Sequence, residues 1–368
     1  MNDNDYMRRA VELAKLGCGF VSPNPMVGAV IVKDGRIIGE GWHARYGDLH
    51  AERAALNSCT ESPVGGVMYV TLEPCCHHGK QPPCTEAVIA SGVKRVVIGS
   101  LDPNPAVSGG GIKALRDHGI EVETGVLKDE CDELNFIFFH YIKTGMPYAT
   151  VKYAMTMDGK TASYTGASKW ITGEAARERV HEDRRRYSAI MTGVGTVLAD
   201  DPLLTCRIEG GRDPLRIICD SRLRTPIESK IVKTAADVPT VIATCVSDRE
   251  RFKEYEEAGC RILTVPQKEG RVDLESLFKT LGGEGIDGVL IESGGTLSWS
   301  VLKSGLASRI QAYIAPKLLG GAGAKSPVGG AGIAHPKDAI PLKNSKISRL
   351  GEDFLIESEV DFDVHRDN

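Results

Sequence analysis

The chain contains the triplet His50-Ala51-Glu52 and, further on, the stretch L-E-P-C-C-H-H-G-K-Q-P-P-C at residues 72–84, which brings in Cys75 and Cys84. One imidazole and two thiolates are ligands that tetrahedral Zn²⁺ prefers, and three protein ligands leave a fourth position for water. Bound zinc lowers the pKa of water from about 16 to about 7. Glu52, two residues after the histidine, is placed to carry that water's proton. These stretches therefore predict a catalytic zinc site.

A His-x-Glu triplet followed by Pro-Cys and a second cysteine is typical of zinc-dependent nucleobase deaminases, in which the glutamate transfers protons. The alternative is a structural zinc site, which normally has four protein ligands. Cys76, His77 or His78 could supply the fourth ligand. Glu52 beside a set of three ligands favours catalysis.

The segments around these residues predict alternating strands and helices. Residues 28–32 and 67–72 have the apolar character of buried strands, and residues 50–58 and 84–91 have helical character. Such alternation is typical of an α/β layered sheet. Ligands at helix starts and strand ends then meet at one edge of the sheet, where a pocket belongs.

A length of 368 residues exceeds the usual size of one domain, so two domains are expected. We place the boundary near residues 143–147, which divides the chain into 1–145 and 146–368. The second part again alternates. Its predicted strands are 189–193, 215–220, 240–244, 261–265, 288–292 and 309–314, and its predicted helices include 174–186 and 274–281.

Composition excludes several classes of protein. A net charge of −4 gives no reason to expect a nucleic-acid-binding protein, and no apolar run is long enough to cross a membrane. The run Arg184-Arg185-Arg186 is either a solvated helix face or an anion-binding site. Ten cysteines in a chain of this length, seven of them scattered singly, do not indicate a disulfide framework, and the polar N-terminus lacks the apolar core of a signal peptide. We therefore expect a reducing, cytoplasmic location.

Two turns of small residues in the second part could approach a phosphate. Residues 291–297, I-E-S-G-G-T-L, follow an apolar strand and precede a helical pattern, and Val194-Gly195-Thr196-Val197 is a second small-residue turn. The usual Gly-x-Gly-x-x-Gly fingerprint is absent. Each turn therefore either binds phosphate at a helix N-terminus or only connects two elements.

Further motifs run in order along nearly the whole chain: N-P-M-V-G-A-V (24–30), D-P-N-P (102–105), V-K-Y-A-M-T-M-D-G-K (151–160), S-K-W-I-T-G (168–173), G-V-G-T-V-L-A-D-D-P-L-L-T (193–205) and D-S-R-L-R-T-P (220–226). With the stretches above, they make the chain resemble the bifunctional deaminase-reductase family of riboflavin biosynthesis. One departure is Gln81, where the family usually has threonine. Gln81 lies between the two cysteines and need not touch the metal.

The resemblance implies an N-terminal cytidine-deaminase-like three-layer α/β/α domain. This domain would hydrolyse the 2-amino group of 2,5-diamino-6-ribosylamino-4(3H)-pyrimidinone 5′-phosphate. Matched to the family's motifs, His50, Cys75 and Cys84 are the expected zinc ligands, and Glu52 is the expected proton carrier. The residues expected to contact this substrate are Asn24, His43, His77, Lys80 and Asn104, and cationic Lys80 suits a phosphate.

The resemblance also implies a C-terminal dihydrofolate-reductase-like α/β domain that uses NADPH to reduce the ribosyl group to ribityl. Its substrate positions fall at Lys152, Ser168, Arg184, Leu204, Arg207 and Glu292. Its NADPH positions fall at Ala154, Trp170, Thr196, Asp200, Ser221, Gly294, Gly295, Thr296, Leu297, Ser298, Trp299 and Ser300.

Physical chemistry is consistent with this assignment. The guanidinium groups of Arg184 and Arg207 can form bidentate hydrogen bonds with a phosphate monoester better than lysine could. Reduction of a sugar carbon needs a proton at its oxygen, and either Lys152 or Asp200 could supply it. Taken without the family pattern, Trp170 would be a core residue, and Asp200 would be a turn residue.

Two other functions remain open from the residues. One is a deaminase of RNA or free nucleosides with an inactive second domain, against which the lack of a basic stripe and the intact 292–297 turn both argue. The other is a binding module in which the zinc is structural. Because reductase-like sheets often pair through an edge, we also expect a homo-oligomer.

Overall fold

The computed structural model describes residues 1–78, 81–104 and 107–362. The chain separates into two compact units, Met1–Gly145 and Met146–Asn368. Each unit has its own sheet and its own hydrophobic core. No helix in the described part of the chain is both long and apolar enough to cross a lipid bilayer.

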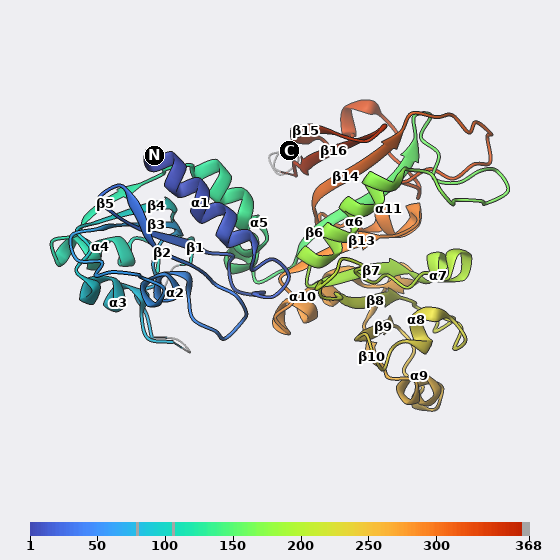
Figure 1. Ribbon diagram of the computed structural model, residues 1–368. Coiled ribbons are helices and arrows are strands. Elements are labelled where there is room, and N and C mark those ends of the chain that lie inside the picture. The colour runs from blue at the N-terminus through green and yellow to red at the C-terminus, as the bar shows by residue number, and fades with distance from the viewer. Residues whose placement is uncertain (79–80, 105–106, 363–368) are drawn as a thin grey trace. The chain divides into compact units, whose positions relative to one another are not determined.

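The first unit is a five-stranded sheet in the order β2-β1-β3-β4-β5, in which β3, β4 and β5 are parallel. Its elements are α1 (Asp3–Lys15), β1 (Gly28–Lys33), β2 (Arg36–Trp42), α2 (Ala51–Asn57), β3 (Val67–Leu72), α3 (Cys84–Ser91), β4 (Arg95–Ser100), α4 (Gly110–Asp117), β5 (Glu121–Thr124) and α5 (Lys128–Thr144). Helices α1 and α5 lie on one side of the sheet and α2, α3 and α4 on the other (Figure 1). This is the predicted three-layer α/β/α arrangement.

Helix α2 packs closely against strand β2. A Cβ atom on Gly41 in β2 would lie 2.2 Å from the backbone nitrogen of Ala55 in α2, so only glycine fits there. This contact holds α2 against the sheet. His50 caps the helix, and Glu52 lies in its first turn.

The second unit is a nine-stranded sheet in the order β10-β9-β8-β7-β13-β6-β14-β16-β15. The first seven strands of this order are parallel to one another, and β16 and β15 each pair antiparallel with the strand before them. The strands are β6 (Tyr148–Thr156), β7 (Ala189–Gly193), β8 (Leu215–Cys219), β9 (Thr240–Thr244), β10 (Cys260–Thr264), β13 (Gly288–Glu292), β14 (Ala307–Ala315), β15 (Leu342–Leu350) and β16 (Asp353–Val360). A small separate hairpin is formed by β11 (Gln267–Lys268) and β12 (Arg271–Val272).

Helices cover both faces of this sheet. The helices are α6 (Glu174–Arg186), α7 (Val194–Asp200), α8 (Lys230–Lys233), α9 (Lys253–Glu257), α10 (Leu274–Gly283) and α11 (Gly295–Lys303), with short 3₁₀ helices at Arg249–Phe252 and Pro336–Asp338. The apolar residues of α10 and α11 share one core with the sheet, whereas α6 to α9 pack on the opposite face. The predicted α/β class is confirmed for both units.

Most predicted elements lie where the sequence placed them, and two differences are informative. The turn expected at residues 194–197 is instead the start of helix α7, which begins directly after β7. Residues 128–144 form α5, although the sequence analysis assigned no element there. Residues 320–332 contain neither helix nor strand.

Candidate active sites

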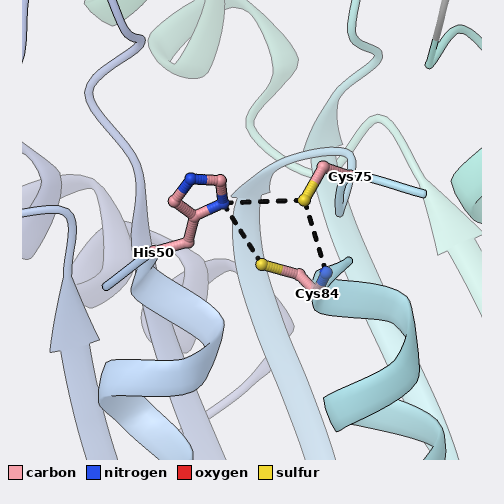
Figure 2. A group of neighbouring side chains, drawn as sticks. All are labelled: His50, Cys75 and Cys84. Atoms are coloured by element: carbon pink, nitrogen blue, oxygen red, sulfur yellow. Dashed lines mark hydrogen bonds between the residues drawn. The ribbon is translucent and has the colours of Figure 1, made fainter. Parts of the chain in front are cut away.

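Three predicted metal ligands meet in the first unit. His50 precedes α2, Cys75 follows β3, and Cys84 is the first residue of α3 (Figure 2). His50 Nδ1 lies 3.6 Å from Cys75 Sγ and 3.3 Å from Cys84 Sγ. Tetrahedral zinc, with bonds of about 2.1 Å to nitrogen and 2.3 Å to sulfur, places its ligand atoms roughly 3.6–3.8 Å apart. The side chains therefore fit a zinc ion.

The alternative fourth ligands do not join this group. Within the described residues, the ligand atoms that lie within 4.8 Å of one another belong to His50, Cys75 and Cys84. Cys76 Sγ lies 3.9 Å from Val107 O, and the exposed His78 lies 3.7 Å from Glu86. His77 is also exposed. Three protein ligands are the number found in catalytic zinc sites.

Glu52 lies beside the metal ligands. Its side chain is buried, and it hydrogen-bonds with the side chain of Cys84. Burial raises the pKa of the Glu52 carboxyl above its ordinary value. A buried carboxyl next to a water-activating metal is suited to accept and release a proton.

Asn24 and His43 are neighbours on another side of the group. His43 Nδ1 lies 3.0 Å from Leu49 O, and His43 Nε2 lies 3.2 Å from Asn24 Nδ2. Because a carbonyl only accepts hydrogen bonds, Nδ1 carries the proton, and Nε2 accepts from Asn24. Burial lowers the pKa of His43, which keeps its ring neutral. The centres of the His43 and His50 rings lie 5.4 Å apart, and the planes of the two rings are at 74° to each other.

Glu73 was not singled out from the sequence, yet it organises the loop that carries Asn104. Its carboxylate accepts hydrogen bonds from the backbone N–H groups of Gly109, Gly111 and Ile112 at 3.0–3.2 Å. Asp102 N lies 3.4 Å from the same carboxylate. In turn, Asn104 N donates to Asp102 Oδ1 at 2.8 Å. A glutamate directly before Pro-Cys was the available signal. Lys80, the predicted phosphate contact, lies outside the described residues.

The second unit contains a cavity of about 750 Å³ at the carboxyl ends of its parallel strands. Fourteen predicted residues line it: Lys152, Ala154, Ser168, Arg184, Thr196, Asp200, Leu204, Ser221, Glu292, Gly294, Gly295, Thr296, Leu297 and Ser300. The carboxyl edge of such a sheet is where ligands of α/β folds bind. The structure thus brings together residues up to 148 positions apart in the sequence, from Lys152 to Ser300.

Four predicted residues of this unit are not among the lining residues. Arg207 is exposed, and Ser298 is fully buried in α11. Trp299 packs against the chain at Gly330, where an added Cβ would lie 2.0 Å from Trp299 Cδ1. Trp170 is 62% exposed, with the Arg177 guanidinium 4.7 Å from its ring centre.

Charged side chains are paired at one end of the cavity. Arg184 Nε and Nη2 donate to the two oxygens of Glu292 at 2.7 and 3.0 Å, and Arg184 Nη1 donates to Thr205 O at 2.9 Å. Lys152 Nζ lies 3.5 Å from Glu292 Oε2. Burial alone would raise the pKa of Glu292, but the charges of Arg184 and Lys152 lower it to about 2. In this structure the guanidinium of Arg184 therefore forms its bidentate hydrogen bonds with Glu292.

Further hydrogen bonds set the shape of the cavity. Ser168 Oγ donates to Asp200 Oδ1 at 3.2 Å, and Gly294 N donates to Thr196 Oγ1 at 3.1 Å. The second bond ties the start of α7 to the turn before α11. Gly294 caps α11, so the first backbone N–H groups of that helix are available to an anionic group.

Two family models match different parts of the chain. Residues 147–356 match the family model of the RibD C-terminal domain, and residues 1–100 match the cytidine and deoxycytidylate deaminase zinc-binding region. The chain is 52% identical over 357 residues to the riboflavin biosynthesis protein RibD of Actinobacillus pleuropneumoniae, covering 97% of this chain and 95% of that one. It is 42% identical over 355 residues to RibD of Aquifex aeolicus, covering 96% and 97%.

Solved structures give the same result. Acinetobacter baumannii RibD is 38% identical to the chain, with a TM-score of 0.86 and coverage of 98% and 99%. The diaminohydroxyphosphoribosylaminopyrimidine deaminase/5-amino-6-(5-phosphoribosylamino)uracil reductase of Thermotoga maritima is 38% identical, with a TM-score of 0.85 and the same coverage. The similarity thus extends over both units.

Proposed function

The chain belongs to the RibD family of riboflavin-biosynthesis enzymes, and we propose that each of its two units catalyses one of the two reactions of that family. The enzyme hydrolytically deaminates 2,5-diamino-6-ribosylamino-4(3H)-pyrimidinone 5′-phosphate, and it then reduces the ribosyl group of the product to ribityl. Its cofactors are Zn²⁺ and NADPH.

We assign deamination to residues 1–145 and reduction to residues 146–368. The observation that carries this division is the separation of the two sets of residues. The group His50, Cys75 and Cys84 lies within the first unit, and every residue lining the 750 Å³ cavity lies within the second.

In the first unit, His50, Cys75 and Cys84 hold the zinc. Bound there, zinc supplies a Lewis acid that makes water nucleophilic near neutral pH. Glu52 takes a proton from the attacking water and delivers it to the leaving amino group, which departs as ammonia. Burial beside Cys84 keeps Glu52 within reach of both positions. Because the substrate gains water and loses ammonia, the step needs no other reactant.

The remaining groups of the first unit bind and orient the pyrimidine. Since Asn24 Nδ2 is bonded to neutral His43, its Oδ1 atom is left to accept a hydrogen bond from the substrate. Asn104, on the loop that Glu73 holds, adds a second polar contact. We assign His77 and Lys80 to the same substrate because of their motif positions.

In the second unit, Lys152 delivers the proton and NADPH supplies the hydride. When bound, NADPH would supply this hydride to C1′ of the ribosyl group. The bond between C1′ and the ring oxygen breaks, that oxygen receives the proton from Lys152, and the bond from C1′ to the amino nitrogen is kept. We choose Lys152 over Asp200 because the ammonium lines the cavity and is held by Glu292, whereas Asp200 accepts a hydrogen bond from Ser168. The sugar site is formed by Ser168, Arg184, Leu204 and Glu292. The exposed guanidinium of Arg207 can form bidentate hydrogen bonds with the phosphate.

NADPH lies along the rest of the cavity. Gly295 and Thr296 offer their backbone N–H groups to its diphosphate at the start of α11. Ala154, Thr196, Asp200, Ser221, Leu297 and Ser300 line the same space. Trp170, Ser298 and Trp299 are assigned to the cofactor by motif position alone.

We also propose that the enzyme is cytoplasmic and binds neither nucleic acid nor membrane, since all ten cysteines are free thiols and the net charge is −4. A homo-oligomer is supported by β15, an edge strand on which Ile347 is 70% exposed. Light scattering measures this directly, and a monomer at working concentration would contradict it.

The division of labour is tested with two variants of the full chain. Glu52→Gln should stop ammonia release while retaining zinc and full reduction of the separately prepared deaminated substrate. Lys152→Ala should do the reverse, lowering NADPH oxidation by about 10²-fold or more without changing ammonia release. The assignment fails if either variant loses both reactions or neither.

A further inference from the structure

Three arginines with no assigned role line the reductase cavity. Arg222 and Arg224 lie on the loop after β8, and Arg271 lies in β12. The two segments are joined, because Val272 N donates to Ser221 Oγ at 2.9 Å. Arg271 Nη1 also lies 3.5 Å from Ser300 Oγ in α11. The three side chains thus converge on one end of the cavity from separate parts of the chain.

This end of the cavity has an uncompensated positive charge. Within the described residues, no carboxylate lies within 4.0 Å of the guanidinium of Arg222 or Arg271. Arg224 Nε lies 3.8 Å from Asp220 Oδ1, but Asp220 is fully buried. Its Oδ2 atom accepts hydrogen bonds from Thr225 N and Oγ1, and Arg222 N donates to its Oδ1 atom at 3.4 Å. The acidic residues that line the cavity are Asp200 and Glu292, and Glu292 is already paired with Arg184 and Lys152.

The order of strands separates this basic end from the reacting end. Lys152 belongs to β6 and Glu292 to β13, and β7 and then β8 follow in the sheet (Figure 1). At about 4.8 Å between neighbouring strands, the end of β8 lies roughly 14 Å from Lys152 along the carboxyl edge. The phosphate-binding turn at Gly294 lies between them, after β13. An extended dinucleotide with its nicotinamide near Lys152 therefore directs its adenosine half towards β8.

We propose that Arg222, Arg224 and Arg271 bind the 2′-phosphate of NADPH and so select NADPH over NADH. This inference rests on the proposed function of the second unit. Planar guanidinium groups match phosphate oxygens in pairs, whereas a dehydrogenase that selects NADH places a carboxylate at the ribose 2′-hydroxyl. Asp220, which lies directly after β8, is fully buried, and its carboxylate accepts hydrogen bonds from its own loop.

Equilibrium binding to the full chain tests this assignment without turnover. Isothermal titration calorimetry gives the dissociation constants of NADPH, NADH, 2′,5′-ADP and 5′-AMP for the wild type and for the double variant Arg222→Gln/Arg271→Gln. We expect NADPH and 2′,5′-ADP to bind about 10- to 100-fold more weakly to the variant, because charged hydrogen bonds to the phosphate are lost. NADH and 5′-AMP should change less than about twofold, and the salt dependence of NADPH binding should decrease.

The matched control is Arg249→Gln. Arg249 is an exposed arginine of the same unit that does not line the cavity, and its guanidinium lies 5.8 Å from the Phe252 ring centre. The Arg249→Gln substitution removes one positive charge and should leave all four dissociation constants unchanged. An unchanged thermal transition of the second unit shows that each variant is folded.

The possible outcomes are distinct. The arginine assignment is overturned if the double variant binds NADPH and NADH equally more weakly than the wild type, or if it binds both as tightly. It is also overturned by wild-type protein that binds 5′-AMP as tightly as 2′,5′-ADP, a comparison that needs no variant. If the wild type binds neither NADPH nor NADH, the proposed reductase function itself fails.

Discussion

Arg184 and Glu292 form a doubly hydrogen-bonded ion pair, with Arg184 Nε 2.7 Å and Nη2 3.0 Å from the two carboxylate oxygens. Their side chains are only 11% and 12% exposed. Lys152 shares the same carboxylate, so one negative charge compensates two positive charges at the reacting end of the cavity. The sequence placed all three residues in the substrate site. Their mutual pairing means that each also holds the others in position.

Removing this shared carboxylate should destabilise the second unit. Glu292→Gln leaves Arg184 and Lys152 as nearly buried charges without a counter-charge, and loss of one partner of a buried pair costs about 3–5 kcal/mol. Denaturation of the full chain in urea measures the change. The control is Glu269→Gln, because Glu269 pairs with Lys303 at an exposed position, 74% and 56% exposed. That control should change the free energy of unfolding by less than about 1 kcal/mol, and an equal loss in both variants would contradict the prediction.

The same carboxylate should contribute to the pH dependence of stability. The pKa of Glu292 is about 2 in the folded chain, against about 4.3 in an unfolded one. A lowered pKa contributes stability that is fully present above the unfolded value and is lost as the pH falls through the folded value. From pH 5 to pH 2, the wild type should therefore lose up to about 3 kcal/mol that Glu292→Gln does not lose. Parallel stability curves for the two proteins over this range would refute the assignment.

Replacing Glu73 should impair deamination through the loop that carries Asn104. Glu73→Gln puts an amide NH₂ group where the carboxylate now accepts hydrogen bonds from Gly109, Gly111 and Ile112, which leaves some of these N–H groups unpaired. We expect a loss of about 1–3 kcal/mol in stability and a higher KM for ammonia release. The reductase reaction should be unaffected.

Glu61→Gln is the control for this experiment. Glu61 is a glutamate of the same unit whose partner, Arg36, is 68% exposed. If Glu73→Gln matches this control in both stability and KM, Glu73 does not organise the loop.

Metal removal should separate the two reactions. A chelator, or Cys84→Ser, should abolish ammonia release, because His50 and Cys75 alone leave zinc with too few protein ligands. Reduction of the deaminated substrate should continue at the wild-type rate. Added Zn²⁺ should restore the chelated wild type. Chelation that stops NADPH oxidation as well would place the metal in a role that the second unit also needs.

Regular elements with strong local patterns could be predicted from the sequence. The strands Ala189–Gly193, Thr240–Thr244 and Gly288–Glu292 and the helix Glu174–Arg186 lie where they were expected. Strand β15 could not be recognised in this way, because nearly all of its residues are exposed and no apolar alternation marks it. Its position comes from pairing with β16.

Helix α5 shows a different cause of failure. It contains the non-helical residue Asn135, whose side chain exchanges two hydrogen bonds with the backbone of Met26, 109 residues earlier. Because this partner is distant in the sequence, no local pattern could have indicated it. The bonds compensate for the interruption of the helix.

The sequence by itself was enough to predict that His50, Cys75 and Cys84 form one group, and it determined the α/β class of both units and the family. Metal ligands and glycine-rich turns leave a local trace, because their chemistry demands particular residue types at short spacings. Only the tertiary structure decided that Arg184 pairs with Glu292 and that Arg222 and Arg271 line the same cavity. The reason is physical: the charge balance of a site depends on distances between side chains, and these are set by the order of strands in the folded sheet.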